Sequence, residues 1–328
     1  MTLSADKLLP GDVLLFRGDT IIGWAIRFFD GTPVNHAGLY VGDGKVNEAL
    51  GNGLTARALA ESTAGNKMWV RRLKKPAPTM QPVLGVAQAY LGSHTKYGFS
   101  EIILLLFLSL TRKVTASSVF YSLVRSLLDK SAAILDRILA GQQKHMICSE
   151  FVFRCYDEAD PSKYDVYTLH IAGFSYQELL KAMALQAPAR AMLMAPARGA
   201  HPESLLSLLA SRSARHWLSP GQQVAQLAAA PEPTDEEINE LLLGYREEVT
   251  SPDLASRLGP MEIPLEDLRA RVDHFANQLR SVMLPEKAVF ETFDQGLEFL
   301  ASPEVVCNFI TPGDLFNCDN LATVIEDL

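Results

Sequence analysis

The sequence predicts an α+β fold from three observations. Residues 34–42 and 45–50 each have the pattern of a strand, and the pair Asp43-Gly44 between them is a strong hairpin signal. A helix is expected to begin at or just before Cys148, because apolar residues recur at helical spacing after it. A succession of helical patterns covers residues 176–300. We therefore expect a small antiparallel sheet packed on the helix that carries Cys148, together with a helical insertion.

The remaining sequence patterns predict further turns, strands and helices that are compatible with an α+β fold. Pro10-Gly11-Asp12 reads as a turn that leads into a short apolar strand, and Thr311-Pro312-Gly313-Asp314-Leu315 repeats that pattern near the end of the chain. Thr234-Asp235-Glu236-Glu237 fits a helix capping box. The other expected strands cover residues 13–16, 54–60, 68–73 and 305–310, and the expected helices cover residues 21–29, 83–91, 117–139, 177–185, 202–217, 236–248, 265–283 and 286–300.

Charge is distributed unevenly along the chain, whose formal net charge is −8. Residues 1–175 contain 19 Lys and Arg against 15 Asp and Glu, whereas residues 176–328 contain 11 against 23. This asymmetry predicts two differently built parts. We expect a core in residues 1–175, a helical insertion or lid in residues 176–300, and a C-terminal segment, residues 301–328, that rejoins the core.

The charge balance and the length of the apolar runs indicate whether nucleic acid or a membrane is an expected partner. The acidic second half argues against a nucleic-acid partner, and the local basic cluster at residues 71–75 is expected to be a solvated loop. Ile102–Leu108 is strongly apolar but much shorter than the roughly 20 residues that span a bilayer. A buried helix is the expectation there, with peripheral membrane contact as the alternative.

Cysteine usage and the N-terminal sequence bear on the compartment. The four cysteines form neither a CxxC pair nor a disulfide framework, which favours a reducing environment and no disulfide scaffold. The N-terminal residues lack a basic region followed by an apolar one, so no standard secretory signal is expected. The sequence thus predicts a cytoplasmic protein without a transmembrane helix, or one exported by a leaderless route.

Three residues together have the chemistry of a thiol nucleophile. Cys148 at a helix start is placed where the helix dipole and free backbone N–H groups favour the thiolate, which is the nucleophilic form. Thiol catalysis also needs an imidazole and a polar group that orients it. The hairpin supplies both, because His36 and Glu48 lie on its two adjacent strands and are brought close. Cys148 is therefore the candidate nucleophile, His36 the base and Glu48 the orienting residue.

The other residues around this site are expected to have structural or supporting roles. The backbone N–H of Cys148 is the expected oxyanion donor, and a second donor is not identified. His145 is expected to be a loop residue, Cys155 a core residue, and Ser149 and Glu150 solvent-facing capping residues. Spacing suited to a metal is missing from the other histidines, so no metal and no cofactor are expected. Those histidines are His94, His170, His201, His216 and His274.

The motifs together resemble a known family, the circularly permuted papain-like hydrolases. They are similar to the NlpC-like superfamily members of the YiiX type, which are related to lecithin:retinol acyltransferases. The resemblance covers somewhat under half of the chain and implies a papain-like core in which Cys148, His36 and Glu48 act as nucleophile, acid–base and orienting residue. The segments that carry it are Pro10-Gly11-Asp12, Asn35–Gly42, Asp43–Ala49, Cys148–Val152 and Thr311–Leu315.

Three functions are consistent with this reading. The first is a thiol hydrolase that cleaves an amide or peptide bond through a thioacyl-enzyme intermediate, with cell-wall peptides as the substrate class that the resemblance implies. The second is a lipid-directed acyltransferase or thioesterase, which would use the apolar run Ile102–Leu108. The third is a non-enzymatic effector that binds a protein partner through the acidic helical region.

Overall fold

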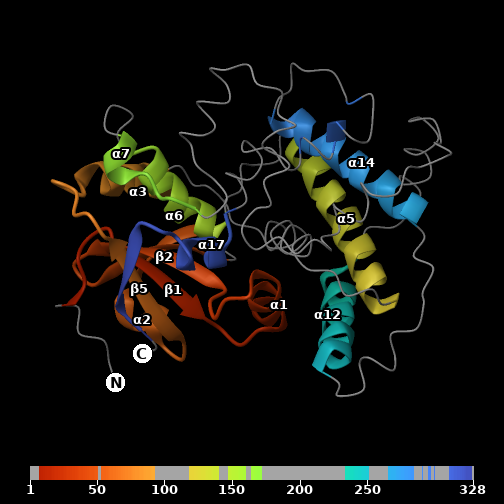
Figure 1. Cartoon of the computed structure of the whole chain (residues 1–328), viewed down its shortest axis with the longest axis horizontal. Coiled ribbons are helices and arrows are strands. Elements are labelled where there is room, and N and C mark those ends of the chain that lie inside the picture. Colours follow the sequence, from red (N-terminus) through yellow and green to blue (C-terminus); the bar gives the residue numbers. More distant parts are fainter. Residues whose placement is uncertain are drawn as a thin grey trace. The chain divides into compact units, whose positions relative to one another are not determined.

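A computed structural model describes residues 7–50, 53–92, 118–139, 147–159, 164–171, 233–250, 265–283, 290, 295–296, 299 and 310–326. The chain divides into two compact units (Figure 1). The first contains Met1–Ile102, Gln143–Arg198 and Val306–Leu328, and the second contains Ile103–Gln142 and Gly199–Val305. The predicted boundaries kept residues 103–142 with the core and placed the insertion at residues 176–300, whereas the second unit contains residues 103–142 and runs from Gly199 to Val305.

The first unit is built on a six-stranded sheet, and every described pair of neighbouring strands is antiparallel. The strand order is β4-β3-β2-β1-β5-β6. The α+β class with an antiparallel sheet is as predicted. The strands are β1 (Val13–Arg17), β2 (His36–Gly42), β3 (Lys45–Leu50), β4 (Gly53–Ala58), β5 (Lys67–Leu73) and β6 (Leu321–Ile325).

The hairpin between β2 and β3 forms where the sequence predicts it. Asp43 and Gly44 both have positive φ, at 50° and 66°, as a two-residue hairpin turn with the twist of the strands requires. The backbone N–H of Gly44 donates to the hydroxyl of Tyr40 at 3.2 Å and ties the turn to β2. The turn fixes the register, and the register in turn fixes which side chains of the two strands share a face.

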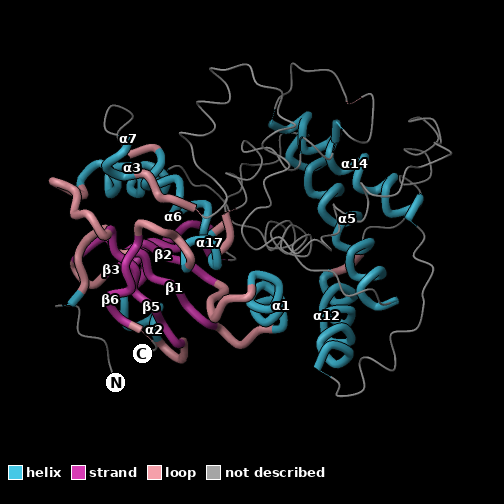
Figure 2. Tube along the Cα trace, viewed as in Figure 1, coloured by secondary structure: helices cyan, strands magenta, loops and turns pink. Residues whose placement is uncertain are grey.

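Both faces of the sheet are covered, as Figure 2 shows. The first face packs against α6 (Cys148–Asp157), with contributions from α3 (Gln81–Gly92), α7 (Tyr164–Tyr167) and α17 (Pro312–Phe316). The second face carries a smaller apolar cluster to which α2 (Leu59–Thr63) contributes Leu59. This short helix begins at Leu59, because β4 stops at Ala58, two residues before the end of the strand expected over residues 54–60.

A buried ion pair fixes the turn at Pro10-Gly11-Asp12. Asp12 is 1% exposed and receives two hydrogen bonds of 2.6 Å from Arg72 and one of 2.8 Å from the backbone N–H of Leu9. The hydroxyl of Tyr156 in α6 donates to the carbonyl oxygen of Gly11, which has a positive φ of 96°. The turn thereby joins β5 to the helix that begins at Cys148.

Two sequence expectations about this region are wrong, the first of them only in part. Of the basic cluster, Arg71 and Arg72 do not lie in a solvated loop, because they belong to β5 and Arg71 donates to the carbonyl oxygens of Cys318 and Leu321. Lys74 and Lys75 follow the strand in an exposed bend, where Lys74 donates to the carbonyl oxygen of Asp319. The second Pro-Gly-Asp segment is not a turn like the first. It forms α17, since Thr311 and Asp314 complete a reciprocal capping box around it.

The C-terminal residues lie in the same sheet as the N-terminal ones. Strand β6 pairs with β5, with Leu73 opposite Leu321.

Helix α1 (Ile21–Asp30) is capped by Thr20 and is followed by Gly31 in the left-handed conformation. Its last residue, Asp30, accepts a hydrogen bond of 3.2 Å from the backbone N–H of Gly313 in α17.

The second unit contains the described helices α5 (Ser118–Leu139), α12 (Asp235–Thr250) and α14 (Leu265–Met283), close to their expected positions. Helix α5 contacts both others. Arg271 of α14 pairs with Asp129 of α5, and Lys130 of α5 pairs with Asp235 of α12 at 3.2 Å. The predicted elements over residues 102–108, 177–185, 202–217 and 305–309, and most of 286–300, lie outside the described residues.

Every helix in the described part of the chain is too short or too polar to cross a bilayer.

Candidate active site

Cys148 is the first residue of α6, as predicted, and its side chain belongs to a residue that is 3% exposed. The residue before it, Ile147, has extended backbone and a side chain that cannot accept a hydrogen bond, so it leaves the first-turn N–H groups uncapped. Glu150 reaches back to the backbone N–H of Ile147 and is held by Arg154 at 2.7 Å. The thiol therefore lies at the positive end of the helix dipole.

His36 is the first residue of β2. Its Nε2–H donates to Oε2 of Glu48 at 2.8 Å, and its ring lies 5.7 Å from that of Phe16. Its side chain is 23% exposed, so a reactant can approach the ring. Because Nε2 is engaged by the carboxylate, the hydrogen bond that joins His36 to Cys148 uses the remaining nitrogen, Nδ1.

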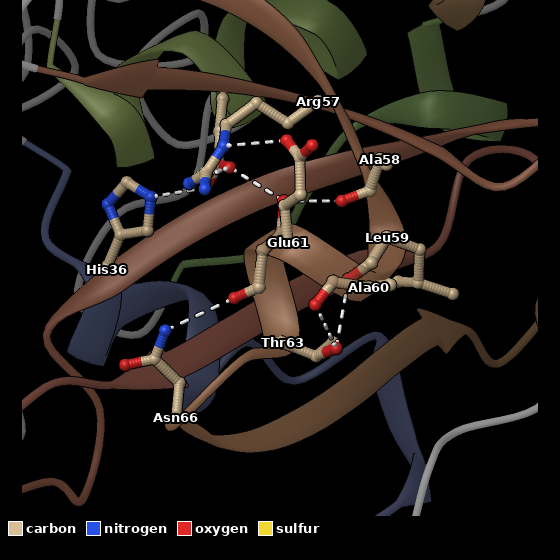
Figure 3. A network of polar contacts seen from close by, with 10 residues as sticks. His36, Arg57, Ala58, Leu59, Ala60, Glu61, Thr63 and Asn66 are labelled. Carbon is tan, nitrogen blue, oxygen red and sulfur yellow. Dashed lines mark hydrogen bonds and ion pairs between the residues drawn. The ribbon is translucent and has the colours of Figure 1, made fainter.

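Glu48 is the most enclosed member of the group, at 2% exposure. Its Oε2 accepts from His36, and its Oε1 accepts from the hydroxyl of Ser62 at 2.7 Å and from Arg57 at 3.2 Å. Arg57 comes from β4 and Ser62 from α2, which follow the β2–β3 hairpin that carries His36 and Glu48. Figure 3 shows His36 and Arg57 in this network, together with Leu59, Ala60, Glu61 and Thr63 of α2.

The contacts favour a thiolate–imidazolium pair. Burial opposes the thiolate of Cys148, but the charge and hydrogen bond of His36 and hydrogen bonds from the backbone N–H groups of Ala37 and Ser149 lower its pKa below the usual value. Burial likewise opposes the imidazolium, yet Cys148 and Glu48 together raise the pKa of His36 to about 10. Burial disfavours the Glu48 carboxylate, but His36, Ser62 and Arg57 outweigh it and lower its pKa.

The other cysteines of the described region have the opposite character. Cys155, about two helical turns further along α6, is completely buried, and burial raises its pKa well above the usual value. Burial also raises the pKa of Cys318, to about 11. Both are free thiols inside the core, as was expected of Cys155. A lowered thiol pKa is thus found at Cys148 within the described residues.

The three residues predicted from the sequence thus lie together, and their catalytic roles stay a prediction. Ser62, Arg57 and the N–H of Ala37 were missed, because no pattern in the sequence shows which neighbours a strand register brings to Glu48. Ser149 was wrongly expected to face solvent, since it is completely buried and donates to the carbonyl oxygen of Ile310. His145 lies outside the described residues.

A metal centre is not evident in the described part of the chain, where no group of three or more His, Cys, Asp or Glu side chains could hold an ion.

No protein-family model matches the chain. The chain is 26% identical over 160 residues to a protein of Escherichia coli strain K12 named probable lipoprotein peptidase YaeF, and the match covers 48% of this chain and 58% of YaeF. This similarity supports the YiiX-type papain-like resemblance that the motifs indicate. The circular permutation and the relation to lecithin:retinol acyltransferases stay predictions.

Among solved structures, the chain is similar to a crystal structure described as metalloprotein yiiX from Escherichia coli O157:H7. The identity is 18%, the TM-score is 0.32, and the match covers 51% of this chain and 73% of that one. At this TM-score the likeness adds no argument about the site.

Proposed function

We propose that the protein is a thiol hydrolase that cleaves an amide or peptide bond through a thioacyl-enzyme intermediate. The observation that carries the proposal is the hydrogen-bonded series from Cys148 through His36 to Glu48, which begins at the N-terminus of a helix. A nucleophile, a base within hydrogen-bond reach and a third group that orients the base are the requirements of this chemistry. The peptidase name of the relative YaeF gives independent support for a hydrolase.

Acylation follows from the charges of the pair. The Cys148 thiolate attacks the carbonyl carbon of the scissile bond, and the carbon–oxygen double bond opens to an oxyanion. The His36 imidazolium then donates its Nδ1 proton to the leaving amine as the carbon–nitrogen bond breaks. A thioester on Cys148 and a neutral His36 result, with Nε2–H still bound to Glu48.

Deacylation reverses the proton movement. Neutral His36 accepts a proton from water as the water oxygen attacks the thioester carbon. Collapse of the second tetrahedral intermediate breaks the carbon–sulfur bond, releases the acid product and restores the thiolate–imidazolium pair. Glu48 keeps its charge throughout and holds the ring in the tautomer that both steps need.

The oxyanion is assigned to the start of α6. The backbone N–H of Cys148 is at the first helical position, where helix geometry provides no intrahelical acceptor. Such a donor beside the nucleophile is suited to a developing negative charge. The N–H groups of Ala37 and Ser149 instead lie against the sulfur, where they stabilise the thiolate.

Peptides are the substrate class that the proposal favours, since YaeF is named a peptidase. Lipid-directed acyl transfer depends on residues 102–108, and protein binding depends on the acidic region 176–300. The first segment and most of the second lie outside the described residues, so neither alternative gains an observation from the structure.

The test compares the wild type with Cys148→Ala on panels of peptides, thioesters and phospholipids. Peptide hydrolysis should fall to background in Cys148→Ala. The matched control is Cys155→Ala, which removes a buried thiol from the same helix and should keep its activity. Hydrolysis that survives in Cys148→Ala would overturn the proposal, and turnover of phospholipids without peptides would replace it with the acyltransferase or thioesterase.

A further inference from the structure

Two residues outside the expected triad converge on the buried carboxylate of Glu48. The hydroxyl of Ser62 donates to its Oε1 at 2.7 Å, and Arg57 donates to the same oxygen at 3.2 Å. Ser62 is 3% exposed, and the Arg57 side chain is about one third exposed. Both donors use one oxygen, which leaves the other, Oε2, to His36.

We propose that Ser62 and Arg57 are positioning residues that fix the charge and orientation of Glu48 and thereby maintain the reactive state of Cys148. The inference rests on the proposed thiol hydrolase function. An ionised carboxylate inside a protein is costly unless hydrogen bonds and an opposite charge compensate it. Ser62 supplies the hydrogen bond, and Arg57 supplies the charge together with a second hydrogen bond.

The orientation of the Glu48 carboxylate follows from the different hydrogen-bond partners of its two oxygens. A free glutamate side chain rotates about its last bond and presents either oxygen to a neighbour. With Oε1 held by donors from β4 and α2, rotation is opposed and Oε2 stays directed at Nε2 of His36. The imidazole is therefore fixed with its Nδ1 toward Cys148, the arrangement that proton transfer requires.

The effect on Cys148 is transmitted by charge. Loss of either donor weakens the preference of Glu48 for its ionised form, and a less ionised Glu48 supports the imidazolium of His36 less. A weaker imidazolium supports the thiolate less. The charged groups around Glu48 in the described residues are His36 and Arg57, and Arg57 also lies 3.7 Å from Glu61, which is 63% exposed.

The experiment measures Cys148 alkylation against pH, together with kcat and KM on a peptide substrate, in Ser62→Ala and Arg57→Met. Each variant should alkylate roughly tenfold more slowly near pH 6, as expected for the loss of a hydrogen bond to a charged group. The midpoint of the alkylation profile should move to higher pH, and kcat should fall with little change in KM. Arg57→Lys should restore part of the loss because it keeps the charge.

Two control variants separate positioning from a merely structural role. Thr63→Ala removes the neighbouring hydroxyl of α2, which bonds only to helix carbonyls among the described residues, and Glu61→Gln removes the other carboxylate beside Arg57. Both should keep the wild-type alkylation profile. Urea unfolding identifies any variant that fails to fold. If Ser62→Ala fails to fold, Arg57→Met still tests the proposal, because Arg57 is at a partly exposed position.

The outcomes distinguish this inference from the function on which it rests. Wild-type alkylation profiles in folded Ser62→Ala and Arg57→Met, with Cys148→Ala inactive, would overturn the positioning role alone. Peptide hydrolysis that persists in Cys148→Ala would instead overturn the hydrolase proposal. A shifted profile in Thr63→Ala equal to that of Ser62→Ala would show that α2 acts only as a structural support.

Discussion

His36 reaches Glu48 along a diagonal of the β2–β3 ladder. The residue directly opposite Glu48 is Gly38, two positions after His36 and on the same face of the sheet. Diagonal neighbours on adjacent strands lie within reach of long side chains. Glycine leaves this diagonal open, because a Cβ on Gly38 would lie 3.4 Å from that of Glu48 and 2.8 Å from Cγ1 of Val46.

The first prediction is that Gly38→Ala destabilises the protein and disturbs the site. Overpacking a close contact costs about 1–3 kcal/mol, and the displaced Glu48 should slow the alkylation of Cys148. Urea unfolding and alkylation kinetics measure the two effects. Gly85→Ala is the control, because a Cβ there meets open space in α3, so it should leave stability unchanged or higher. Equal results for both variants would contradict the close-contact argument.

The second prediction concerns the pH dependence of the thiol. The pKa of Cys148 is lowered and that of His36 is raised to about 10, so the thiolate should be present at neutral pH and persist as a pair until His36 deprotonates. Alkylation of Cys148 should therefore have its midpoint below the value of about 8.5 for an ordinary cysteine. In His36→Ala the midpoint should rise to that value or above, since burial remains.

Selectivity provides the internal control for that measurement. Cys155 and Cys318 have raised pKa values, so folded protein should be labelled at Cys148 well before either of them. Mass spectrometry of the peptides identifies the labelled residue, and urea-unfolded protein should lose the preference. If His36→Ala keeps the wild-type midpoint, the ion pair with the imidazole is not what activates the thiol.

Local signals in the sequence were sufficient for the hairpin and for the helix start. Asp43-Gly44 specifies a turn with two positive φ angles by its own residues, and the spacing of apolar residues after Cys148 places the helix. Helix α14 likewise begins and ends where its pattern predicts. These features depend on neighbours in the chain, which a single sequence displays.

Long-range contacts could not be predicted in the same way. Ser62 meets Glu48 only because β4 ends at Ala58 and one turn of helix follows, and the pattern over residues 54–60 indicated a longer strand. The contact of Arg71 with the carbonyl oxygen of Cys318 joins residues 247 positions apart. Such contacts follow from strand order, which hydrophobic patterning alone does not determine.

The third prediction contrasts the two partners of the buried ion pair. In Arg72→Met the carboxylate of Asp12, at 1% exposure, keeps one backbone donor and loses its charged partner, whereas in Asp12→Asn the guanidinium, at 30% exposure, remains accessible to water. Arg72→Met should therefore cost about 3–5 kcal/mol of unfolding free energy, and Asp12→Asn less. Urea unfolding at neutral pH gives both values.

An equal cost of Arg72→Met and Asp12→Asn in unfolding free energy at neutral pH would contradict the predicted asymmetry.

The last prediction tests the attachment of the C-terminal segment to the nucleophile helix. The hydroxyl of Ser149 donates to the carbonyl oxygen of Ile310, and both residues are completely buried, so Ser149→Ala leaves that oxygen without its donor. The expected cost is about 1–3 kcal/mol of unfolding free energy. Thr250→Ala, which removes an exposed hydroxyl bonded to the carbonyl oxygen of Arg246, should stay within about 0.5 kcal/mol of the wild type.

Because Ser149 follows Cys148 directly, the alkylation rate of Cys148 should also fall in Ser149→Ala. A destabilised Ser149→Ala with wild-type alkylation would show that the contact with Ile310 stabilises the fold without positioning the thiol.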